Sequence, residues 1–415
     1  MAALLWLALP APAGAGQAAR YAAPSGAFGG PCTQADPCDL RTAVDGAASG
    51  QGIRLEGGIY ILGSQDLYID ASNDFAPIDP AQPASLVIGG PSSPATIFAE
   101  AGSSISDLGI RSQGGGTALV VSDSQADRVV TEAEGTARGC ALYGESRLRD
   151  SLCTTTGIFG GLDVISTTGG TDATLRNVTA YGESGALGIY AEGGETTSLD
   201  ARNSIFFSSD EAEADIAAFA SGDGSAIAAD IDSSNYDAVL ELDDPGTSIT
   251  LPQPGAGANQ TAGPLFVDPG SGDFRQQAGS PTIDAGDSTA SDLGATDLGG
   301  NPRLLGDAVD IGAYEAVDET RPVVRITGKP AERTRKRTAT FRFTASDETT
   351  GRADLAVGCT LDGRAEPPCK SPRKYRGLKP GRHVFVVFAT DEAGNISRGG
   401  RYAWKVVKKK RRAGR

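Results

Sequence analysis

The residues best suited to bind or transform a ligand begin with three arginines at one position of a repeated segment. Arg149, Arg176 and Arg202 stand in five-residue segments that align without gaps, 27 and 26 residues apart. If each repeat is one turn of a stacked structure, they should lie about 5 and 10 Å apart on one outward face. Such a row could bind the carboxylates or sulfates of an acidic polysaccharide in bidentate fashion. Neighbouring acidic side chains could equally neutralise it within the protein.

Two aspartates in the second strand of the repeat could act as general acid and general base. Asp163 and Asp215 align two repeats apart, with Gly188 between them, which predicts a separation of about 10 Å. That distance is at or just beyond the roughly 6.5–9.5 Å between the carboxyl groups of inverting glycosidases. The alternative is that both are solvated acidic side chains without a catalytic role.

A polar residue follows each of the three arginines, namely Asp150, Asn177 and Asn203. Aspartate and asparagine tolerate the left-handed backbone conformation better than most residues. We therefore expect these three at a bend of each turn. Stacked side chains at such a bend can hydrogen-bond to one another along the axis of the structure.

Acidic side chains also supply the oxygen ligands that calcium prefers. Asp223, Asp230 and Asp232 are the candidates for this role, although no twelve-residue calcium-binding loop surrounds them. The single histidine, His383, excludes histidine-rich metal sites and disfavours a Ser-His-Asp triad. We therefore expect no cofactor, with calcium as the one ion that the acidic residues could hold.

The six cysteines fall into three pairs that are close in sequence. An even number of close pairs is typical of disulfides in an oxidising compartment. Fifteen connectivities are possible for six cysteines, and buried free thiols are a further alternative. Proximity favours three local disulfides: Cys32–Cys38, Cys140–Cys153 and Cys359–Cys369.

The elements that position these residues are predicted from composition and repetition. Glycine accounts for 56 of the 415 residues, which argues against a helix bundle because each interior glycine costs a helix about 1 kcal/mol relative to alanine. Two or three short apolar strands recur at intervals of roughly 20–30 residues, a spacing typical of solenoids. One such turn cannot bury its apolar side, whereas stacked turns share a continuous core. We therefore predict an all-β fold in which residues 51–262 form a right-handed parallel β-helix.

The open ends of a solenoid require caps. In residues 19–50, which we assign to the N-terminal cap, the spacing of Leu40, Ala43 and Val44 predicts a short amphipathic helix. The letters CDLRTA at 38–43, followed by IRL at 53–55, resemble the N-terminal cap of secreted bacterial pectin-lyase-like β-helix proteins.

Residues 263–316 are expected to form the terminal coil and its cap. They contain GPLFVDP at 263–269, GSPTIDAG at 279–286, TDLGGNPR at 296–303 and VDIGAYE at 309–315. This pattern closely resembles the end segment of the choice-of-anchor family of β-helix surface proteins. An arginine that binds two carboxylates would close the last coil. The expected structural residues of this cap are Asp284, Asp297, Arg303 and Asp310.

The resemblance implies export and retention at the cell surface by a C-terminal device, and few members of the family have a known activity. It also implies a possible catalytic role for an arginine, because pectin-lyase-like lyases use an arginine as a base beside calcium. The chain departs from the related galacturonases, since it has no Gly-His-Gly sequence and no lysine before Lys329. These departures favour a binding protein over an enzyme.

Charge divides the chain near residue 317. The first 316 residues contain 12 Arg, no Lys and 42 Asp and Glu, a net charge of −30, whereas the remainder contains 25 Lys and Arg and 10 Asp and Glu, a net charge of +15. Such a break indicates a domain boundary. We predict a linker at 317–321, a bacterial Ig-like β-sandwich at 322–407, which that segment resembles, and a basic disordered tail at 408–415.

The N-terminal residues 1–18 have the apolar core and Ala-x-Ala sites of a signal peptide, although the usual positive residues before the core are missing. No apolar run reaches the roughly 20 residues that a membrane-spanning helix needs. Together with the cysteine pairs, this predicts a secreted bacterial protein located outside the cell or at its surface. We expect a monomer.

The preferred hypothesis is an exported cell-surface β-helix protein without catalytic activity that binds a polysaccharide or another cell. The alternative is a polysaccharide lyase or glycoside hydrolase that acts on an acidic polysaccharide, with Arg149, Arg176, Arg202, Asp163 and Asp215 as candidate catalytic residues. The acidic charge of the first 316 residues disfavours nucleic acid as a partner. The basic C-terminal part is expected to attach the protein to the anionic cell wall.

Overall fold

The computed structural model describes residues 18–69, 73–80, 84–89, 94–157, 160–210, 212–318, 320–347, 355–365, 369–391 and 394–408. The predicted signal peptide and the predicted basic tail therefore lie outside the described residues, apart from residues 18 and 408. The chain divides into two compact units, Met1–Ala316 and Val317–Arg415. Within the described residues, no helix is long and apolar enough to cross a membrane.

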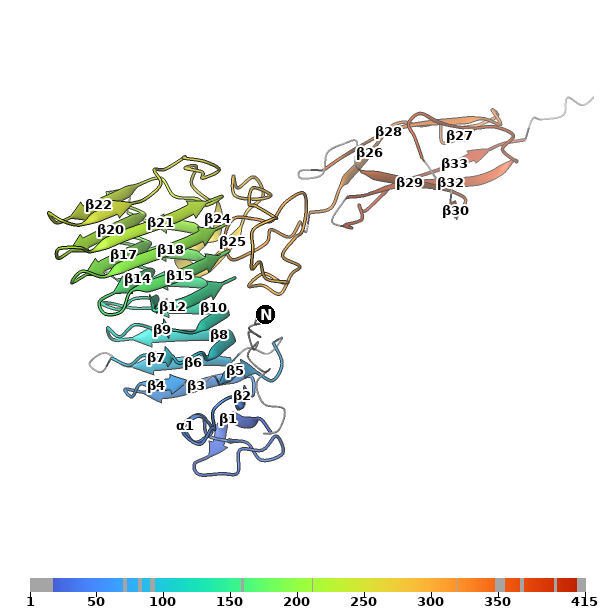
Figure 1. Ribbon diagram of the computed structural model, residues 1–415. Coiled ribbons are helices and arrows are strands. Elements are labelled where there is room, and N and C mark those ends of the chain that lie inside the picture. Colours follow the sequence, from blue (N-terminus) through green and yellow to red (C-terminus); the bar gives the residue numbers. More distant parts are fainter. Residues whose placement is uncertain are drawn as a thin grey trace, which may run out of the picture. The chain divides into compact units, whose positions relative to one another are not determined.

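The first unit is a right-handed parallel β-helix, as its repeats predict (Figure 1). Its largest sheet runs along the whole solenoid, and neighbouring strands pair in parallel. In spatial order the strands are β1 (Arg20–Ala27), β2 (Gly52–Leu55), β5 (Asp74–Pro77), β8 (Ser104–Gln113), β10 (Gln125–Ala133), β12 (Glu145–Arg149), β15 (Thr171–Arg176), β18 (Thr196–Arg202), β21 (Ala226–Asp232) and β23 (Ser248–Thr250).

A second parallel sheet of eight strands forms another face of the solenoid. Its strands are β4 (Leu67–Ile69), β7 (Ile97–Ala99), β9 (Leu119–Ser122), β11 (Cys140–Tyr143), β14 (Leu162–Ser166), β17 (Leu187–Glu192), β20 (Ile216–Ser221) and β22 (Val239–Asp243). We call it the eight-stranded sheet.

Shorter strands form a third row that branches from the largest sheet at β8 and β10. They are β3 (Gly58–Gly63), β6 (Ala84–Gly89), β13 (Leu152–Thr155), β16 (Thr179–Gly182) and β19 (Ile205–Ser208). The three rows enclose one apolar core in which like positions of successive turns stack. One such stack consists of Ile53, Phe75, Ile105, Ala126, Leu148, Leu175, Ala201 and Ile231.

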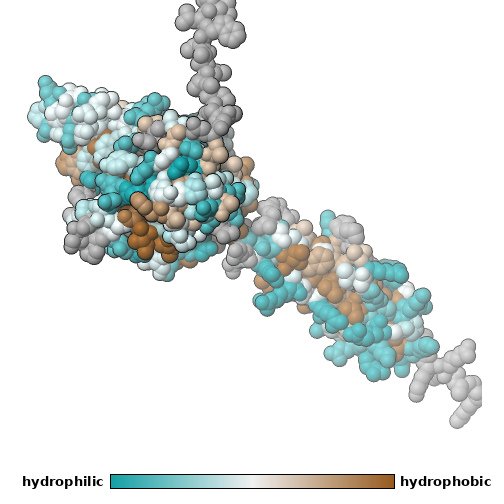
Figure 2. All heavy atoms as spheres, turned by 90° about the horizontal axis from the view of Figure 1, so that it is seen from below, coloured by the Kyte–Doolittle hydropathy of each residue, from teal (hydrophilic) through white to brown (hydrophobic). Residues whose placement is uncertain are grey.

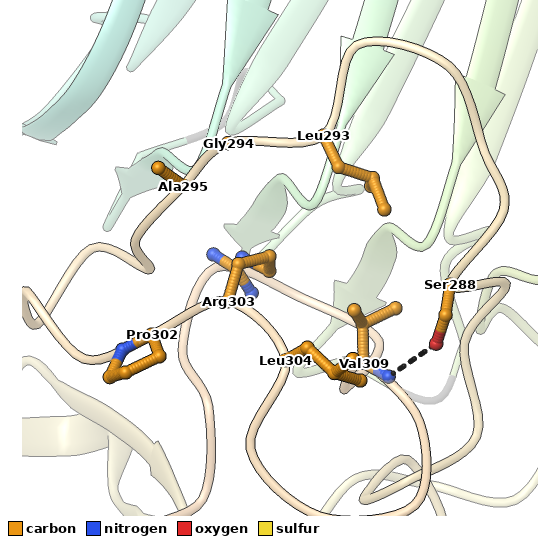
Figure 3. A pocket seen from close by; sticks show the side chains of 8 residues that line it. All are labelled: Ser288, Leu293, Gly294, Ala295, Pro302, Arg303, Leu304 and Val309. Carbon is orange, nitrogen blue, oxygen red and sulfur yellow. Dashed lines mark hydrogen bonds between the residues drawn. The ribbon is translucent and has the colours of Figure 1, made fainter.

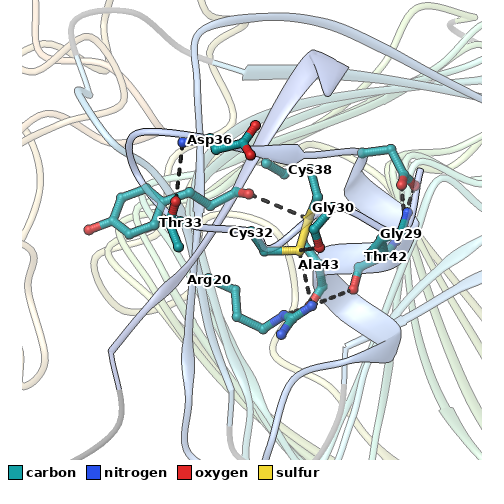
Figure 4. Close-up of a disulfide and its surroundings, with 12 residues drawn as sticks. Arg20, Gly29, Gly30, Cys32, Thr33, Asp36, Cys38, Thr42 and Ala43 are labelled. Atoms are coloured by element: carbon teal, nitrogen blue, oxygen red, sulfur yellow. Dashed lines mark hydrogen bonds between the residues drawn. A yellow bond between two sulfur atoms is a disulfide. The ribbon is translucent and has the colours of Figure 1, made fainter. Parts of the chain in front are cut away.

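The N-terminal end of the solenoid is closed by the predicted amphipathic helix, α1 (Leu40–Asp45), which buries Leu40, Ala43 and Val44. The disulfide Cys32–Cys38 lies beside it, and Arg20 Nε donates to the carbonyl oxygen of Ala43 at 2.8 Å (Figure 4). Figure 2 views this end of the solenoid and shows a mostly hydrophilic surface with a small hydrophobic patch.

All three predicted local disulfides are present, and the described residues contain no free cysteine. Cys140 lies on β11 and Cys153 on β13, so the second disulfide joins two different rows of the solenoid across its core. By chain entropy, a loop of this length contributes roughly 3 kcal/mol.

The segment after the last turn, residues 263–316, contains β24 (Phe266–Asp268), the 3-10 helix η1 (Pro269–Ser271) and β25 (Asp273–Gln276). The expectation that it closes the last coil is wrong. The segment, coloured tan in Figure 1, lies along the flank of β12–β19, far from the final strand β23 in the spatial order. The segment packs on this flank because the side chains of Tyr181 and Phe207 point outward and form an apolar surface. Phe266 and Phe274 of the segment cover that surface.

The second unit consists of two sheets. One contains β26 (Val323–Gly328), β28 (Ala339–Ser346) and β31 (Arg373–Tyr375), and the other contains β27 (Arg333–Thr334), β33 (Gly400–Val406), β32 (Gly381–Thr390), β29 (Ala356–Leu361) and β30 (Arg364–Ala365). Phe341 and Phe385 stack at 4.0 Å between ring centroids in the core, beside Trp404.

Candidate functional site

The three arginines stand directly opposite one another on β12, β15 and β18. Each is held by acidic neighbours on the same sheet. Arg149 pairs with Asp127 at 2.9 Å, and Arg176 pairs with Asp200 at 2.6 Å. Asp200 also contacts Arg202 at 2.9 Å. The row is therefore neutralised within the sheet, as one of the two interpretations of the sequence anticipated.

The terminal segment also covers part of this row. The side chain of Arg176 is only 3% exposed, and its Nε donates to the carbonyl oxygen of Ser291 at 2.8 Å. Arg149 donates in turn to the carbonyl oxygen of Asp292. A polysaccharide could reach the guanidinium of Arg176 only if the terminal segment moved away, whereas the side chains of Arg149 and Arg202 are 23% and 20% exposed.

The residues after the arginines do adopt the left-handed conformation, with φ of 50° at Asp150, 53° at Asn177 and 55° at Asn203. Their side chains, however, do not bond to one another along the axis as expected. Asn177 Nδ2 donates to the carbonyl oxygen of Asp310 at 2.9 Å, and Asn203 Nδ2 donates to that of Asp287 at 3.0 Å. The polar ladder therefore fastens the terminal segment to the flank.

Arg303 completes this attachment from the side of the terminal segment, where it lines a pocket of about 290 Å³ (Figure 3). Its guanidinium is 3% exposed and lies 2.6 Å from Asp150 Oδ1 and 3.2 Å from Glu315 Oε1. The two carboxylates that Arg303 binds are thus Asp150 of the solenoid and Glu315 of the terminal segment. Burial raises the pKa of Asp150 to about 6 and that of Glu315 to about 8.

The other expected cap residues fix turns within the terminal segment. Asp310 accepts hydrogen bonds from the backbone N–H groups of Asp284 and Ala316 at 2.7 and 2.6 Å. Asp297 accepts from the N–H of Glu315 at 2.8 Å, while Asp284 accepts from that of Asp307 at 3.0 Å. These carboxylates compensate backbone donors that have no partner in a sheet.

The alignment predicted for Asp163 and Asp215 is wrong. Gly188 pairs with Asp163 on one side but with Ala217 on the other, so Asp215 precedes β20. Both carboxylate oxygens of Asp215 accept backbone hydrogen bonds, from Ser208 at 2.6 Å and from Asp237 at 2.7 Å. Asp215 therefore stabilises a turn, and the two aspartates do not form a facing catalytic pair.

The acidic residues considered for calcium in the solenoid are also engaged elsewhere. Asp230 pairs with Arg202 at 2.6 Å, and Asp232 Oδ1 accepts a hydrogen bond from the N–H of Ala258. In the part of the chain that the structure describes, Asp223, Asp230 and Asp232 do not come together as a ligand set.

The outward side of the eight-stranded sheet carries a different kind of row, which we call the aromatic face. Tyr68 and Phe98 stack at 4.7 Å between ring centroids on β4 and β7. Farther along, Tyr190 and Phe219 stack at 5.1 Å on β17 and β20. Val120 continues the column of Tyr68 and Phe98, whereas Tyr143 and Ile165 stand two residues later in their strands, in the column of Tyr190 and Phe219.

A groove of about 460 Å³ lies on this face over β7, β9, β11 and β14. Its lining combines the side chains of Phe98, Val120, Tyr143 and Ile165 with a larger number of polar groups. The residues that line it are Thr96, Phe98, Glu100, Thr117, Val120, Ser122, Asp123, Tyr143, Gly144, Ile165, Thr167, Thr168 and Thr171.

A buried ion pair lies beside the groove in the same face. Asp163 is fully buried and binds Arg138, whose side chain is 32% exposed. Burial raises the pKa of Asp163 to about 6, and the charge of Arg138 opposes this shift. Because Asp163 is inaccessible, it cannot protonate a ligand, and its role is to hold the guanidinium of Arg138 at the surface.

Glycine at position 188 allows Tyr190 to lie against Asp163. A Cβ atom at this position would come within 2.4 Å of Asp163 Oδ1 and 2.6 Å of the Tyr190 ring. Burial, together with the charge of Asp163, raises the pKa of Tyr190 to about 12, so its hydroxyl remains a hydrogen-bond donor at neutral pH.

The sequence analysis missed the aromatic face because, in the second strand of each repeat, it compared only the position of Asp163, Gly188 and Asp215. The signal lay two residues later, where Tyr190 and Phe219 follow the paired Gly188 and Ala217. Outward residues of a strand alternate with inward ones, so aromatic side chains at like positions of successive turns must stack on the outside.

Comparison with known proteins gives limited information. A scan against protein-family models gives no match, and neither does a comparison with curated proteins. Among solved structures, the crystal structure of pectate lyase Pel9A is similar to 72% of this chain and 96% of that chain, with 12% sequence identity and a TM-score of 0.32. A likeness this weak carries no argument about this chain.

Proposed function

We propose that this chain is an exported, surface-associated β-helix protein that binds a neutral polysaccharide on its aromatic face and does not cleave it. The observation that carries the proposal is the alignment of aromatic side chains over successive turns beside a polar-rimmed groove. Aromatic faces pack against the C–H side of pyranose rings because their faces carry partial negative charge. Rim hydroxyl and carboxyl groups can bond to the sugar hydroxyls.

Charge favours a neutral ligand over an acidic one. Glu100 and Asp123 line the groove, and Arg138 is already paired with Asp163. The first 316 residues carry a net charge of −30. A uronic acid or sulfated polymer would therefore meet repulsion both at the groove and over the surrounding surface.

The enzyme alternative has less support from the geometry. Catalysis by two carboxyl groups requires a pair across the ligand, whereas Asp163 is buried beneath the surface and Asp215 is bonded to backbone amides. An arginine acting as a base would need exposure, whereas Arg176 lies beneath the terminal segment. Export is supported by the three disulfides, which form in oxidising compartments.

Attachment to the producing cell is a second part of the proposal. The last 99 residues carry 25 Lys and Arg against 10 Asp and Glu. Cell-wall polymers of bacteria are commonly anionic, so we assign wall attachment to this basic part. Attraction between exposed charges is screened beyond about 8 Å at physiological salt. Binding of the full chain to wall preparations should therefore weaken steeply as salt rises, and loss of residues 408–415 should weaken it further.

The experiment that tests ligand binding is affinity electrophoresis of the full, oxidised chain in gels containing neutral or acidic polysaccharides. We expect neutral β-glucan, mannan or xylan to retard the chain at low and at high salt. Retardation by polygalacturonate or alginate, which the basic C-terminal part can cause, should disappear at high salt. Tyr143→Ala and Tyr190→Ala should each weaken binding about tenfold, as central aromatic contacts usually do. Phe28→Ala, which removes an exposed aromatic side chain of the N-terminal cap, serves as the matched control and should have no effect.

Three outcomes would contradict the proposal. Equal retardation of the tyrosine variants would show that the aromatic face is not the site. Binding to acidic polymers alone would refute the neutral ligand class. New reducing ends or unsaturated products after incubation would identify an enzyme.

A further inference from the structure

Three aspartates converge in the second unit, which is otherwise strongly basic. Asp318 lies near the start of this unit, Asp347 directly follows β28, and Asp391 directly follows β32. One carboxylate oxygen from each lies within 4.8 Å of those from the other two. Like charges at this distance repel one another, and a cation bound between them would relieve the repulsion.

The buried carboxylate of Asp391 is a second indication of a bound cation. The residue is 6% exposed, and its Oδ2 atom is buried without any hydrogen-bond partner in the structure. Its other oxygen accepts a hydrogen bond from the N–H of Asn395 at 2.6 Å. A buried carboxylate oxygen without a donor costs several kcal/mol unless it is protonated or binds a cation.

The loop and the beginning of the unit are held so that the three carboxylates converge. Asn395 Nδ2 donates to the carbonyl oxygen of Asp318 at 2.6 Å, which ties residue 318 to the loop that follows β32. Asp318 Oδ1 accepts hydrogen bonds from the N–H and hydroxyl groups of Thr320. These contacts hold Asp318 next to the loop that carries Asp391.

We propose that Asp318, Asp347 and Asp391 form a calcium site. Their ligand oxygens all lie within 4.8 Å of one another, close enough for one cation to contact all three. Calcium accepts irregular sets of carboxylates, backbone carbonyls and waters, whereas magnesium demands near-ideal octahedral geometry and keeps several of its waters. Zinc prefers nitrogen and sulfur ligands, which this cluster does not provide.

The calcium ion would join the first residues of the unit to the ends of strands from both of its sheets, because β28 and β32 belong to different sheets. Waters and backbone carbonyl groups would complete the coordination. The consequence is a second unit that is more stable in the calcium concentrations outside a cell. This inference is independent of the proposed polysaccharide site, which lies in the other unit.

The test uses the full chain with Trp6→Phe, which leaves Trp404 as its only tryptophan. Trp404 is 2% exposed in the core of the second unit, so its fluorescence reports unfolding of that unit. Protein freed of metal with a chelator is titrated calorimetrically with calcium chloride and with magnesium chloride. We expect a calcium dissociation constant on the order of 10⁻⁴–10⁻³ M and binding of magnesium at least tenfold weaker.

The midpoint of thermal unfolding, followed by Trp404 fluorescence, should rise by roughly 4 °C or more at about 5 mM calcium. Asp391→Asn and Asp347→Asn should abolish this rise and weaken calcium binding at least tenfold. Glu332→Gln, which neutralises an exposed acid of the same unit outside the cluster, is the matched control and should behave as the parent chain.

The proposal is overturned if the parent chain shows neither binding heat nor a midpoint shift up to about 10 mM calcium, well above the expected constant. It is equally overturned if both asparagine variants retain the shift. The Trp404 spectrum of each variant in chelator establishes that it is folded. Should Asp391→Asn fail this criterion, the more exposed Asp347→Asn decides the result.

Discussion

Two outward faces of the β-helix carry stacked aromatic side chains, and they differ in what lies over them. On the row β13–β16–β19, Tyr181 and Phe207 contact Phe274 and Phe266 of the terminal segment. On the eight-stranded sheet, Tyr190 and Phe219 stack on each other. No apolar cluster joins that second pair to another segment of the part of the chain that the structure describes.

The difference separates structural ladders from candidate binding surfaces. A solenoid repeats its residues on every outward face, so repetition alone does not identify a site. The arginine row and the Tyr181–Phe207 pair are both engaged by residues of the terminal segment. The aromatic face is left with a groove instead of a covering segment, and exposed apolar surface of this kind is typical of interaction sites.

The largest effect should follow from releasing the covering segment. Arg303→Ala removes the cation between the buried carboxylates of Asp150 and Glu315. Breaking a buried pair in this way costs about 3–5 kcal/mol. We expect a lower melting temperature and rapid proteolysis within residues 277–316. Arg275→Ala, at an arginine that is 65% exposed, is the control and should leave both measurements unchanged.

The aromatic residues of the two faces should respond differently to truncation. Phe274→Ala should lower the free energy of unfolding by about 3 kcal/mol, because this side chain of the terminal segment is 3% exposed where it packs against Tyr181 of the solenoid. Phe219→Ala should cost about 1 kcal/mol or less, because its ring is partly exposed on the sheet. Only Phe219→Ala should weaken polysaccharide binding. If chemical denaturation showed equal losses of stability for Phe274→Ala and Phe219→Ala, the distinction between a covered and an uncovered aromatic face would be wrong.

The solenoid and its disulfides were predictable from the sequence. The repeat, the small residues and the cysteine pairs each concern residues that are close to one another in the chain. The position of the terminal segment could not be predicted in this way. Its attachment depends on contacts such as Asn177 to Asp310, which join residues 133 positions apart. Repeat periodicity predicts that turns stack, but it does not say which flank a non-repeating segment will cover.

The candidate site was less predictable. The Asp163–Asp215 alignment failed because the stretch before β20 is longer than the matching stretch before β17, and a shift of two residues leaves the apolar pattern unchanged. A period of two therefore cannot distinguish these alignments. The ion pair of Asp163 with Arg138, 25 residues earlier, joins adjacent turns and has no local signal in the sequence.

A third variant alters the aromatic face from beneath. In Gly188→Ala the new methyl group would collide with Asp163 and with the Tyr190 ring, at 2.4 and 2.6 Å. We expect a loss of about 1–3 kcal/mol in stability, as for other overpacked sites, and weaker polysaccharide binding because Tyr190 is displaced. Gly270→Ala provides a comparison at a glycine of ordinary backbone conformation, where the new Cβ would meet only an ordinary contact at 3.7 Å. Unchanged binding by Gly188→Ala would show that the position of Tyr190 is irrelevant to the ligand.

The smallest expected effect is a dependence of the covered flank on pH. Glu315 has a folded pKa of about 8 against an ordinary value of 4.5, because burial disfavours its charge. Between these values the folded state holds a proton that the unfolded state has lost, so stability is highest near pH 5 and falls as pH rises toward 8. Full linkage between these pKa values would amount to roughly 4 kcal/mol. Because a buried carboxyl relaxes toward water when it ionises, we expect about 1 kcal/mol of this, a fall of roughly 2–4 °C in the melting temperature.

Glu315→Gln resembles the protonated side chain and should flatten this decline. A melting temperature that rises from pH 5 to pH 8, or an unchanged slope between pH 7 and 8 in the glutamine variant, would contradict the assignment to Glu315. The carboxyls of Asp150 and Asp163, with pKa values of about 6, contribute mainly below that range.

The most direct measurement of the central claim is oxidative footprinting of the full chain with and without a saturating neutral polysaccharide, read out by mass spectrometry of each aromatic residue. Our account predicts protection of Tyr143, Tyr190 and Phe219, with no change at Phe28 of the N-terminal cap. Protection confined to the terminal segment or to the second unit, or no protection on the eight-stranded sheet while the polysaccharide is bound, would contradict it.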